Sequence, residues 1–280
     1  MIKNPTQLKA LLNNIAKAKG ISPQSVLQRY FMERLLDRIA MSAYRKNFIL
    51  KGGLLISAVV GIDVRTTMDI DTTTRGIEPT RENIERIFIE ICAICLDDDF
   101  GFSINRLTDI RGSNDQPGVR LHLRVSFHSI KGWLSVDVTA GDEITPEAIE
   151  YCIPTILGDT SIQVFAYNLE TILAEKLETI VSRGIANTRP RDFYDVYVFI
   201  KEKENDINLI ILSSAIRATS SKRGSVNAIN NHKAIIASIK IDPEMIERWE
   251  KYRSSYCQVQ NISFAEVCDC VDKLMDKLER

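Results

Sequence analysis

The sequence predicts a mixed α/β (α+β) fold, in which a sheet-containing core lies between an N-terminal helical segment and a helical C-terminal lobe. Apolar residues recur at helical spacing through the first 46 residues, and the same spacing returns from residue 166 onward. Between these two parts, short apolar segments with period-two alternation are separated by turn residues. We therefore expect a helical segment at residues 1–46, a core at residues 47–165 and a helical lobe at residues 166–280.

The composition is that of an ordinary globular protein. Hydrophobic residues make up 45% and charged residues 26% of the 280 positions, which excludes disordered and collagen-like chains. No apolar run approaches the roughly 18 residues that a membrane-spanning helix needs, and the N-terminus lacks the apolar stretch of a secretory signal. Six cysteines fit a reducing compartment. We therefore expect a cytoplasmic protein without a membrane partner.

Charge is distributed unevenly along the chain. The formal net charge is −1, yet residues 1–51 carry ten Lys and Arg against two acids, Glu33 and Asp37, which gives this segment a net charge of +8. Such a segment either presents a positive face to a phosphate backbone or forms an ordinary solvated helical surface. The sequence leaves both interpretations open.

The N-terminal segment contains signals for two helices. The first has apolar residues at helical spacing and ends at Gly20. Ser22 followed by Pro23 then favours a new start, because serine can cap exposed backbone N–H groups and proline fits the first turn of a helix.

The core begins with a strand that runs directly into two glycines. Residues 48–50 form a short apolar run, Gly52 and Gly53 follow, and residues 54–60 have helical character. Glycines between a strand and a helix allow backbone N–H groups to approach a phosphate, whose negative charge the helix N-terminus favours. The alternative is a plain turn without a ligand.

A second strand, expected near Arg65–Thr72, carries a pair of acids. On a strand, Thr67, Asp69 and Asp71 share one face, and the apolar residues between them, Met68 included, pack inward. Two carboxylates side by side repel each other unless a cation lies between them. Such a pair suits Mg²⁺ with a bound nucleotide, because Mg²⁺ takes few carboxylates together with substrate phosphates. The alternative is an exposed acidic edge of the sheet.

Three further strands are expected near residues 102–110, 120–128 and 133–139. In the last of them, Asp137 stands among apolar residues. An acid on a third strand can complete the ligand set of a metal site that the other two acids begin. We therefore include Asp137 among the candidate metal ligands.

The C-terminal lobe contains a lysine at an apolar position. When residues 169–181 are placed on a helical wheel, Lys176 falls inside the apolar arc, while Glu175 and Glu178 point away from it. A lysine directed into a protein must find an anion or lose its charge. That anion is either a carboxylate in a structural ion pair or a substrate phosphate.

A second helix of this lobe opens with the sequence Arg189-Pro-Arg-Asp-Phe-Tyr-Asp195. Asp192 and Asp195 lie on a helix that is otherwise apolar almost all round. Acids near a helix N-terminus are common because of the helix dipole alone. If they are buried, however, they need cationic partners, and Lys176 or a nearby arginine can supply them.

Together these segments resemble the AbiEii-like nucleotidyltransferase family of the polymerase-β superfamily, whose members include toxins of bacterial abortive-infection and toxin–antitoxin systems. The likeness spans about residues 47 to 200. At the position after the glycine pair, where the superfamily usually has Ser or Thr, this chain has Leu54. The four motifs follow in family order: Lys51-Gly52-Gly53, Arg65-x-Thr67-x-Asp69-Ile70-Asp71, Glu175-Lys176-Leu177 and Arg189-Pro190-Arg191-Asp192-Phe193-Tyr194-Asp195.

The resemblance implies a polymerase-β-type nucleotidyltransferase core with a mixed sheet. In this family pattern Asp69 and Asp71 would hold Mg²⁺, Lys176 would neutralise phosphate charge, and Asp192 would orient the acceptor or act as a base. The nucleotide-contacting set that the resemblance implies comprises Lys51, Gly52, Gly53, Arg65 and Thr67.

The function expected from this resemblance is Mg²⁺-dependent transfer of a nucleotide from an NTP to an acceptor, first of all tRNA. The protein would then be the toxin of a toxin–antitoxin pair, with a cognate antitoxin as a partner. Positioning and charge neutralisation suffice for phosphoryl transfer, so this residue set is chemically adequate. The alternatives are the same chemistry on a protein or on a small molecule such as an aminoglycoside, or a non-catalytic nucleotide-binding module.

Overall fold

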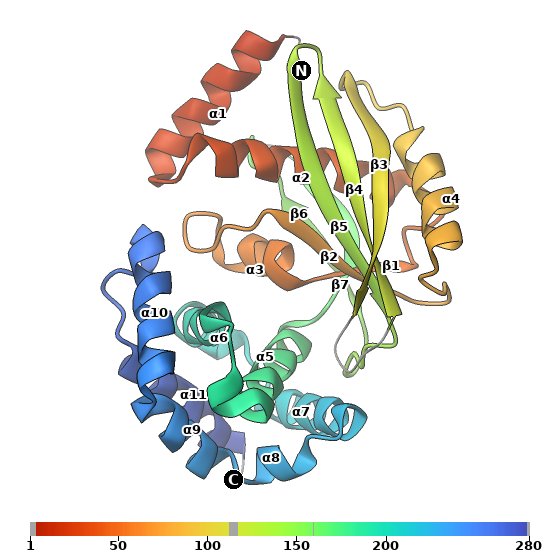
Figure 1. Ribbon diagram of the computed structural model, residues 1–280. Helices are drawn as coiled ribbons and strands as arrows, with labels where there is room; N and C mark the ends of the chain where they lie inside the picture. The colour runs from red at the N-terminus through yellow and green to blue at the C-terminus, as the bar shows by residue number, and fades with distance from the viewer. Residues whose placement is uncertain (1–3, 112–116, 159, 279–280) are drawn as a thin grey trace. The chain divides into compact units, whose positions relative to one another are not determined.

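The computed structural model describes residues 4–111, 117–158 and 160–278, and the chain divides into two compact units. The first unit comprises Met1–Asp142 and Ala148–Tyr167, and the second comprises Glu143–Glu147 and Asn168–Arg280. The N-terminal helices and the sheet therefore belong to one unit, and the second unit is helical (Figure 1).

The two N-terminal helices begin and end at the predicted signals. Helix α1 (Pro5–Lys19) stops at Gly20, which has a φ of 65°, in the left-handed region. Helix α2 (Pro23–Met41) starts after Ser22, whose side chain accepts a hydrogen bond from the backbone N–H of Ser25 at 3.0 Å. Both predicted helices are confirmed.

In the described residues of the first unit, seven strands form one mixed sheet in the order β3-β4-β5-β2-β1-β7-β6. The β1–β7 and β2–β5 pairs are parallel, and the other neighbours are antiparallel. The sheet and the predicted α/β class are confirmed, although β6 and β7 were not predicted individually. The strands are β1 (Phe48–Lys51), β2 (Asp69–Thr74), β3 (Phe100–Arg111), β4 (Pro117–Phe127), β5 (Ile130–Ala140), β6 (Ile149–Pro154) and β7 (Ser161–Ala166).

The two faces of the sheet differ in chemistry. One face carries apolar side chains such as Ile70 and Val136, which are fully buried, and α2 and α4 (Arg81–Cys92) pack on it. Residues that alternate with these along β2 and β5, including Asp69, Asp71 and Asp137, lie on the opposite face. Helix α3 (Gly52–Val60) follows β1 directly and contacts β1 and β2. The apolar face builds the core and leaves the other face available for polar chemistry.

The second unit consists of helices, as predicted. Along the described part of the chain, no helix combines the length and the apolar character that crossing a membrane requires. The helices are α5 (Leu169–Arg183), α6 (Pro190–Lys203), α7 (Leu209–Arg223), α8 (Val226–Asn230), α9 (His232–Ile241), α10 (Pro243–Ser255) and α11 (Phe264–Leu278), joined in part by short 3-10 turns.

The packing of α2 on the sheet yields a first prediction. A Cβ atom on Gly132 of β5 would overlap the ring of Phe31 of α2, with Cδ2 only 3.1 Å away. Gly132→Ala should therefore lower the free energy of unfolding by about 1–3 kcal/mol, as overpacking does. Gly101→Ala is a matched control on β3, because its Cβ would meet only the small Ser126 hydroxyl, 2.8 Å away. Urea denaturation measures both; equal losses would contradict the assignment, and Phe31→Leu should rescue Gly132→Ala.

Candidate functional site

Three carboxylates lie on neighbouring strands on the polar face of the first unit. Asp69 and Asp71 belong to β2, and Asp137 belongs to β5, directly beside Asp71 in the parallel register. Asp69 is likewise paired with Ser135. The alternation of side chains therefore directs all three acids to the same face, as the sequence predicted for the first two.

Arg120 of β4 supplies positive charge to this acidic cluster. It is paired with Asp137 in the antiparallel register, and its guanidinium donates to both carboxylate oxygens, at 2.6 and 2.7 Å. The pKa of Arg120 is raised, first because its guanidinium donates to Asp137, and also because Asp69 and Asp71 lie near enough to stabilise its charge. Asp137 is thus held by a bidentate pair, while Asp69 and Asp71 lie on β2, one strand further from β4.

The glycine pair makes close contact with the acids. Gly52 has a φ of 65°, and a Cβ atom there would overlap the Asp71 carboxylate, with Cγ 2.6 Å away. The Gly53 N–H donates to Asp71 Oδ2 at 3.3 Å. A Cβ on Gly53 would lie 2.6 Å from Thr67 Oγ1 and 3.3 Å from the Arg65 guanidinium. The structure therefore brings the first two family motifs, predicted from separate segments, into contact at the start of α3.

The second predicted strand starts later than expected. β2 begins at Asp69, so Thr67 and Met68 lie in the connection before it, and the prediction of a strand from Arg65 is wrong. The buried Gln28 of α2 explains where the ladder stops, because its amide donates to the carbonyls of Met68 and Trp133 at 2.9 and 3.1 Å. Met68 consequently does not pack inward: its side chain is 44% exposed.

Lys51, at the end of β1, is fixed by contacts on the same sheet. Its ammonium donates to Thr139 Oγ1 at 2.9 Å and to the carboxylate of Asp142. Burial would raise the pKa of Asp142, but the adjacent Lys51 ammonium outweighs this effect, so the pKa is lowered. The lysine therefore stands beside the glycine turn with an ionised partner.

In the second unit, Lys176 points into the helical lobe, as the helical wheel predicted. Its ammonium lies 2.6 Å from Asp192 Oδ1 and 3.0 Å from Asp195 Oδ2 of α6. Burial would lower the pKa of Lys176, but the two carboxylates outweigh it and raise the pKa. Asp192 Oδ2 is buried and, among the described residues, has no hydrogen-bond partner. The cationic partner that the sequence required for the two buried acids is therefore Lys176.

The two glutamates flanking Lys176 are not directed to solvent. Arg223 of α7 donates to Glu178 Oε2 at 2.6 Å and to Glu175 Oε1 at 2.9 Å. The Glu178 side chain is only 4% exposed. The helical wheel placed both acids correctly outside the apolar arc of α5, but it could not show that α7 covers that face.

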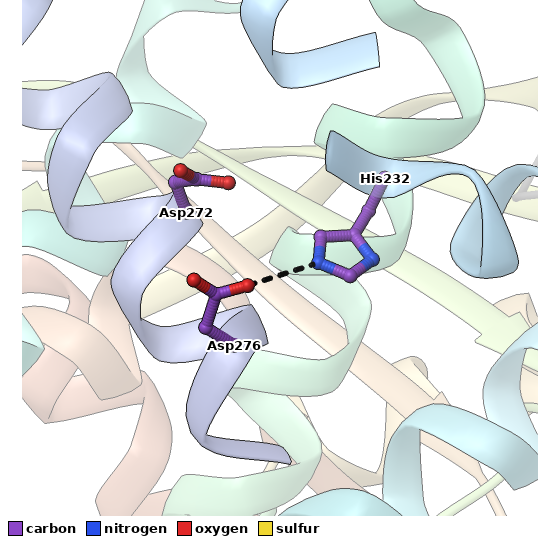
Figure 2. Close-up of side chains that lie close together, drawn as sticks. All are labelled: His232, Asp272 and Asp276. Atoms are coloured by element: carbon purple, nitrogen blue, oxygen red, sulfur yellow. Dashed lines mark ion pairs between the residues drawn. The ribbon is translucent and has the colours of Figure 1, made fainter. Parts of the chain in front are cut away.

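A histidine and two acids of the second unit form another cluster (Figure 2). His232, at the start of α9, faces Asp272 and Asp276 of α11, and their potential ligand atoms lie within 4.8 Å of one another. Such groups are usual ligands of divalent metals. However, Lys233 Nζ lies 3.2 Å from the same Asp276 oxygen that His232 approaches at 3.9 Å. Because Lys233 already neutralises Asp276, the geometry does not require an ion there, and none of the predicted metal ligands belongs to this cluster.

Several residues of these arrangements were not predicted as site residues. Arg120 had a signal, because it alternates with His122 and Arg124 on one face of β4 and so lines up polar side chains. Asp142 had none, since it follows β5 in an irregular segment and its partner Lys51 lies 91 positions earlier. Long-range pairings of this kind become visible only with the sheet order.

Comparison with known proteins identifies the class and the family of this chain. The class is that of nucleotidyltransferases. Residues 34–269, well over half of the chain, match the family described as "Nucleotidyl transferase AbiEii toxin, Type IV TA system", and the chain belongs to this family. The resemblance inferred from the motifs is thereby confirmed.

The fold has a counterpart among solved structures. A crystal structure from H. pylori, described as that of a candidate nucleotidyltransferase, has 17% sequence identity and a TM-score of 0.50, covering 92% of this chain and 98% of that chain. JHP933 from Helicobacter pylori has 16% identity and a TM-score of 0.48, with 92% and 94% coverage. No curated protein matches this sequence significantly.

The contact between Gly52 and Asp71 yields a second prediction. Gly52→Ala should lower the free energy of unfolding by about 2 kcal/mol more than Gly20→Ala, because overpacking against a fixed neighbour adds to the backbone strain. Gly20 is a matched control: it has the same φ of 65°, but its Cβ would meet nothing within 4 Å. Urea denaturation compares the two variants, and equal losses would show that the Asp71 contact is not a constraint.

The buried pair of the second unit yields a third prediction. Lys176→Met should lower the free energy of unfolding by about 3–5 kcal/mol, because it leaves two buried carboxylates without their cation. Lys222→Met removes an exposed lysine whose Nζ lies 4.0 Å from Glu143, and should change stability by about 0.5 kcal/mol or less. Adding Asp192→Asn and Asp195→Asn to Lys176→Met should recover part of the loss, and no recovery would argue against charge as its cause.

Proposed function

We propose that this protein transfers a nucleotide from an NTP to tRNA in a reaction that requires Mg²⁺, in the cytoplasm, as the toxin of a toxin–antitoxin pair. Membership of the AbiEii family supports the nucleotidyltransferase chemistry and the antitoxin partner. The observation that carries the proposal is the contact of the Gly52-Gly53 turn with Asp71, which places the N-terminus of α3 beside a carboxylate of the candidate metal pair.

The donor set fits Mg²⁺. Asp69 and Asp71 offer hard carboxylate oxygens on one face of β2, and both side chains are partly exposed. Asp137, the third candidate ligand, has both oxygens engaged by Arg120 and would bind an ion only through its remaining lone pairs. When bound, Mg²⁺ would neutralise charge on the transferring phosphates.

The reaction is a displacement at phosphorus. A hydroxyl oxygen of the acceptor forms a bond to the α-phosphorus of the NTP, the bond from that phosphorus to the bridging oxygen breaks, and pyrophosphate leaves. The hydroxyl proton passes to a base. The N–H groups at the start of α3 would hold the phosphates, because a helix N-terminus favours negative charge. Lys51, Arg65 and Thr67 support this turn from the side of β1 and the β2 connection.

We propose that Lys176 and Asp192 also act in this reaction. Their proposed roles, charge neutralisation for the lysine and acceptor orientation or proton acceptance for the aspartate, rest on the family motifs. The buried Asp192 Oδ2 supports the second role, because in the described residues it has no hydrogen-bond partner of its own.

The net charge of +8 on residues 1–51 is weaker evidence for a tRNA acceptor than it is in the sequence alone. Most of the cations of this segment are neutralised in pairs, either within α2 or with acids elsewhere in the first unit. These pairs are Lys19–Asp63, Arg29–Glu33, Arg34–Asp37, Arg38–Asp98, Arg45–Glu150 and Lys51–Asp142.

The fourth prediction tests the proposed reaction. Purified protein is incubated with each α-³²P-labelled NTP, Mg²⁺ and total tRNA, and label should pass to tRNA with at least one NTP. Asp69→Asn should reduce the rate by on the order of 100-fold or more, as loss of a charge-stabilising group does, and EDTA should abolish it. Asp109→Asn is the control, since Asp109 is exposed and pairs with Arg81 of α4.

Label on a protein or small molecule instead of tRNA would keep the transfer chemistry and reject the acceptor. A wild-type protein that binds Mg-NTP without transferring label to any acceptor would contradict the proposed reaction. An Asp69→Asn variant as active as the wild type would remove Asp69 from the site.

A further inference from the structure

A cavity of about 590 Å³ opens beside Asp69 in the first unit. Residues of α2, β2, β3, β4 and β5 line it, and Asp69 is the one acid among the lining residues in the part of the chain that the structure describes. The side chains that give it its chemistry are Met68, Asp69, Arg106, His122, Lys131 and Trp133.

Two large apolar side chains in this cavity are exposed. Trp133 is 54% exposed and Met68 is 44% exposed. Their backbones are joined by Gln28, whose buried amide donates to both carbonyls. The two backbones are therefore held at fixed positions, and exposed apolar side chains that lie together among polar residues are typical of a binding surface.

One face of the Trp133 ring is covered by a cation. The Arg124 guanidinium lies over it, 5.2 Å from the ring centroid, in a cation–π contact. A planar ring has two faces, so a second planar group can stack on the other. Nucleobases stack on aromatic side chains whatever their sequence, because every base has a π-face.

Positive charge surrounds the ring. Arg106 and Lys131 line the cavity, and Arg124 lies over Trp133. Cations combined with an aromatic platform bind single-stranded nucleic acid, in which unstacked bases and the phosphate backbone are both accessible.

The strand order separates this cavity from the glycine turn. β2 pairs with β1, which leads into Gly52-Gly53, on one side, and with β5, which carries Trp133, on the other. Asp69 lines the cavity, whereas Asp71 contacts the glycine turn. Phosphates of a donor NTP at the glycine turn would therefore leave the cavity to the acceptor strand.

We propose that the Trp133–Met68 cavity binds the unpaired 3′-terminal nucleotides of the RNA acceptor, with a base stacked on Trp133 and the backbone held by Arg106 and Lys131. This inference rests on the proposed function, since it assigns the acceptor side of the same site. Trp133 is a positioning residue here: it holds the strand so that the terminal hydroxyl reaches Asp69.

The test measures binding without requiring transfer. Two fluorescein-labelled RNA hairpins are compared by anisotropy, one with a four-nucleotide unpaired 3′ end and one blunt. Trp133→Ala should weaken binding of the overhang hairpin by about 5- to 150-fold, the range of one base–aromatic stack, and should leave blunt-hairpin binding and Mg-NTP binding unchanged. Trp133→Phe should restore most of the affinity. Arg106→Ala should weaken binding and reduce its salt dependence by about one phosphate contact.

Intrinsic fluorescence gives a second readout. The chain has two tryptophans, and Trp249 is completely buried in the second unit. Quenching by the overhang hairpin should therefore come from Trp133 and be absent in Trp133→Phe. Ile89→Ala is the matched control, because Ile89 is also exposed, at 58%, but belongs to α4 on the apolar side of the sheet.

Equal binding of the two hairpins, or Trp133→Ala binding the overhang as tightly as the wild type, would overturn the inference even if nucleotide transfer is observed. Conversely, Asp69→Asn should keep overhang binding while losing transfer. If the wild type transfers nothing but shows the overhang preference and its dependence on Trp133, the proposed reaction fails and the binding site stands.

Discussion

Negative charge on one face of β2 and β5 is the constraint around which the first unit is arranged. Asp69, Asp71 and Asp137 share that face because side chains alternate along paired strands, and neighbouring carboxylates repel. Arg120 offsets part of this repulsion through a bidentate ion pair with Asp137. The Gly53 N–H offsets part of the negative charge by donating to Asp71. This approach is possible only because Gly52 also lacks a Cβ atom, which would overlap the Asp71 carboxylate.

In both units, a lysine that is largely buried is paired with carboxylates. Lys51 is clamped by Asp142 in the first unit, and Lys176 by two aspartates of α6 in the second. A buried ion pair contributes little net stability when compared with well-packed apolar residues, but removing one partner is costly. Such pairs therefore fix charges at defined positions rather than stabilise the fold. In the first unit, stability comes from the apolar face of the sheet, on which α2 and α4 pack.

Local patterns in the sequence predicted local structure well, and they failed where a distant residue decides the outcome. The strand–glycine–helix unit at residues 48–60, the helix starts at Pro23 and Pro190, and the inward direction of Lys176 all follow from periodicity and capping, and all are confirmed. The start of β2 was wrong because Gln28, forty positions earlier, takes the Met68 carbonyl. Likewise, periodicity carries no information about which strands pair, so Arg120 as the partner of Asp137 lay beyond reach of the sequence alone.

The order of strands places different chemistry on the two sides of β2. β2 stands between β1, which leads into the glycine turn, and β5, which carries the exposed Trp133. Asp71 contacts the glycine turn, whereas Asp69 lines the cavity. A triphosphate needs N–H donors and a cation, whereas an RNA end needs a stacking surface and spaced positive charges. In the proposed reaction, placing these requirements on opposite sides of one short strand would bring an attacking hydroxyl and an α-phosphate to the same pair of carboxylates, and neither substrate would compete for the other's contacts. In this arrangement the N-terminal cations need not meet RNA, because most already have carboxylate partners.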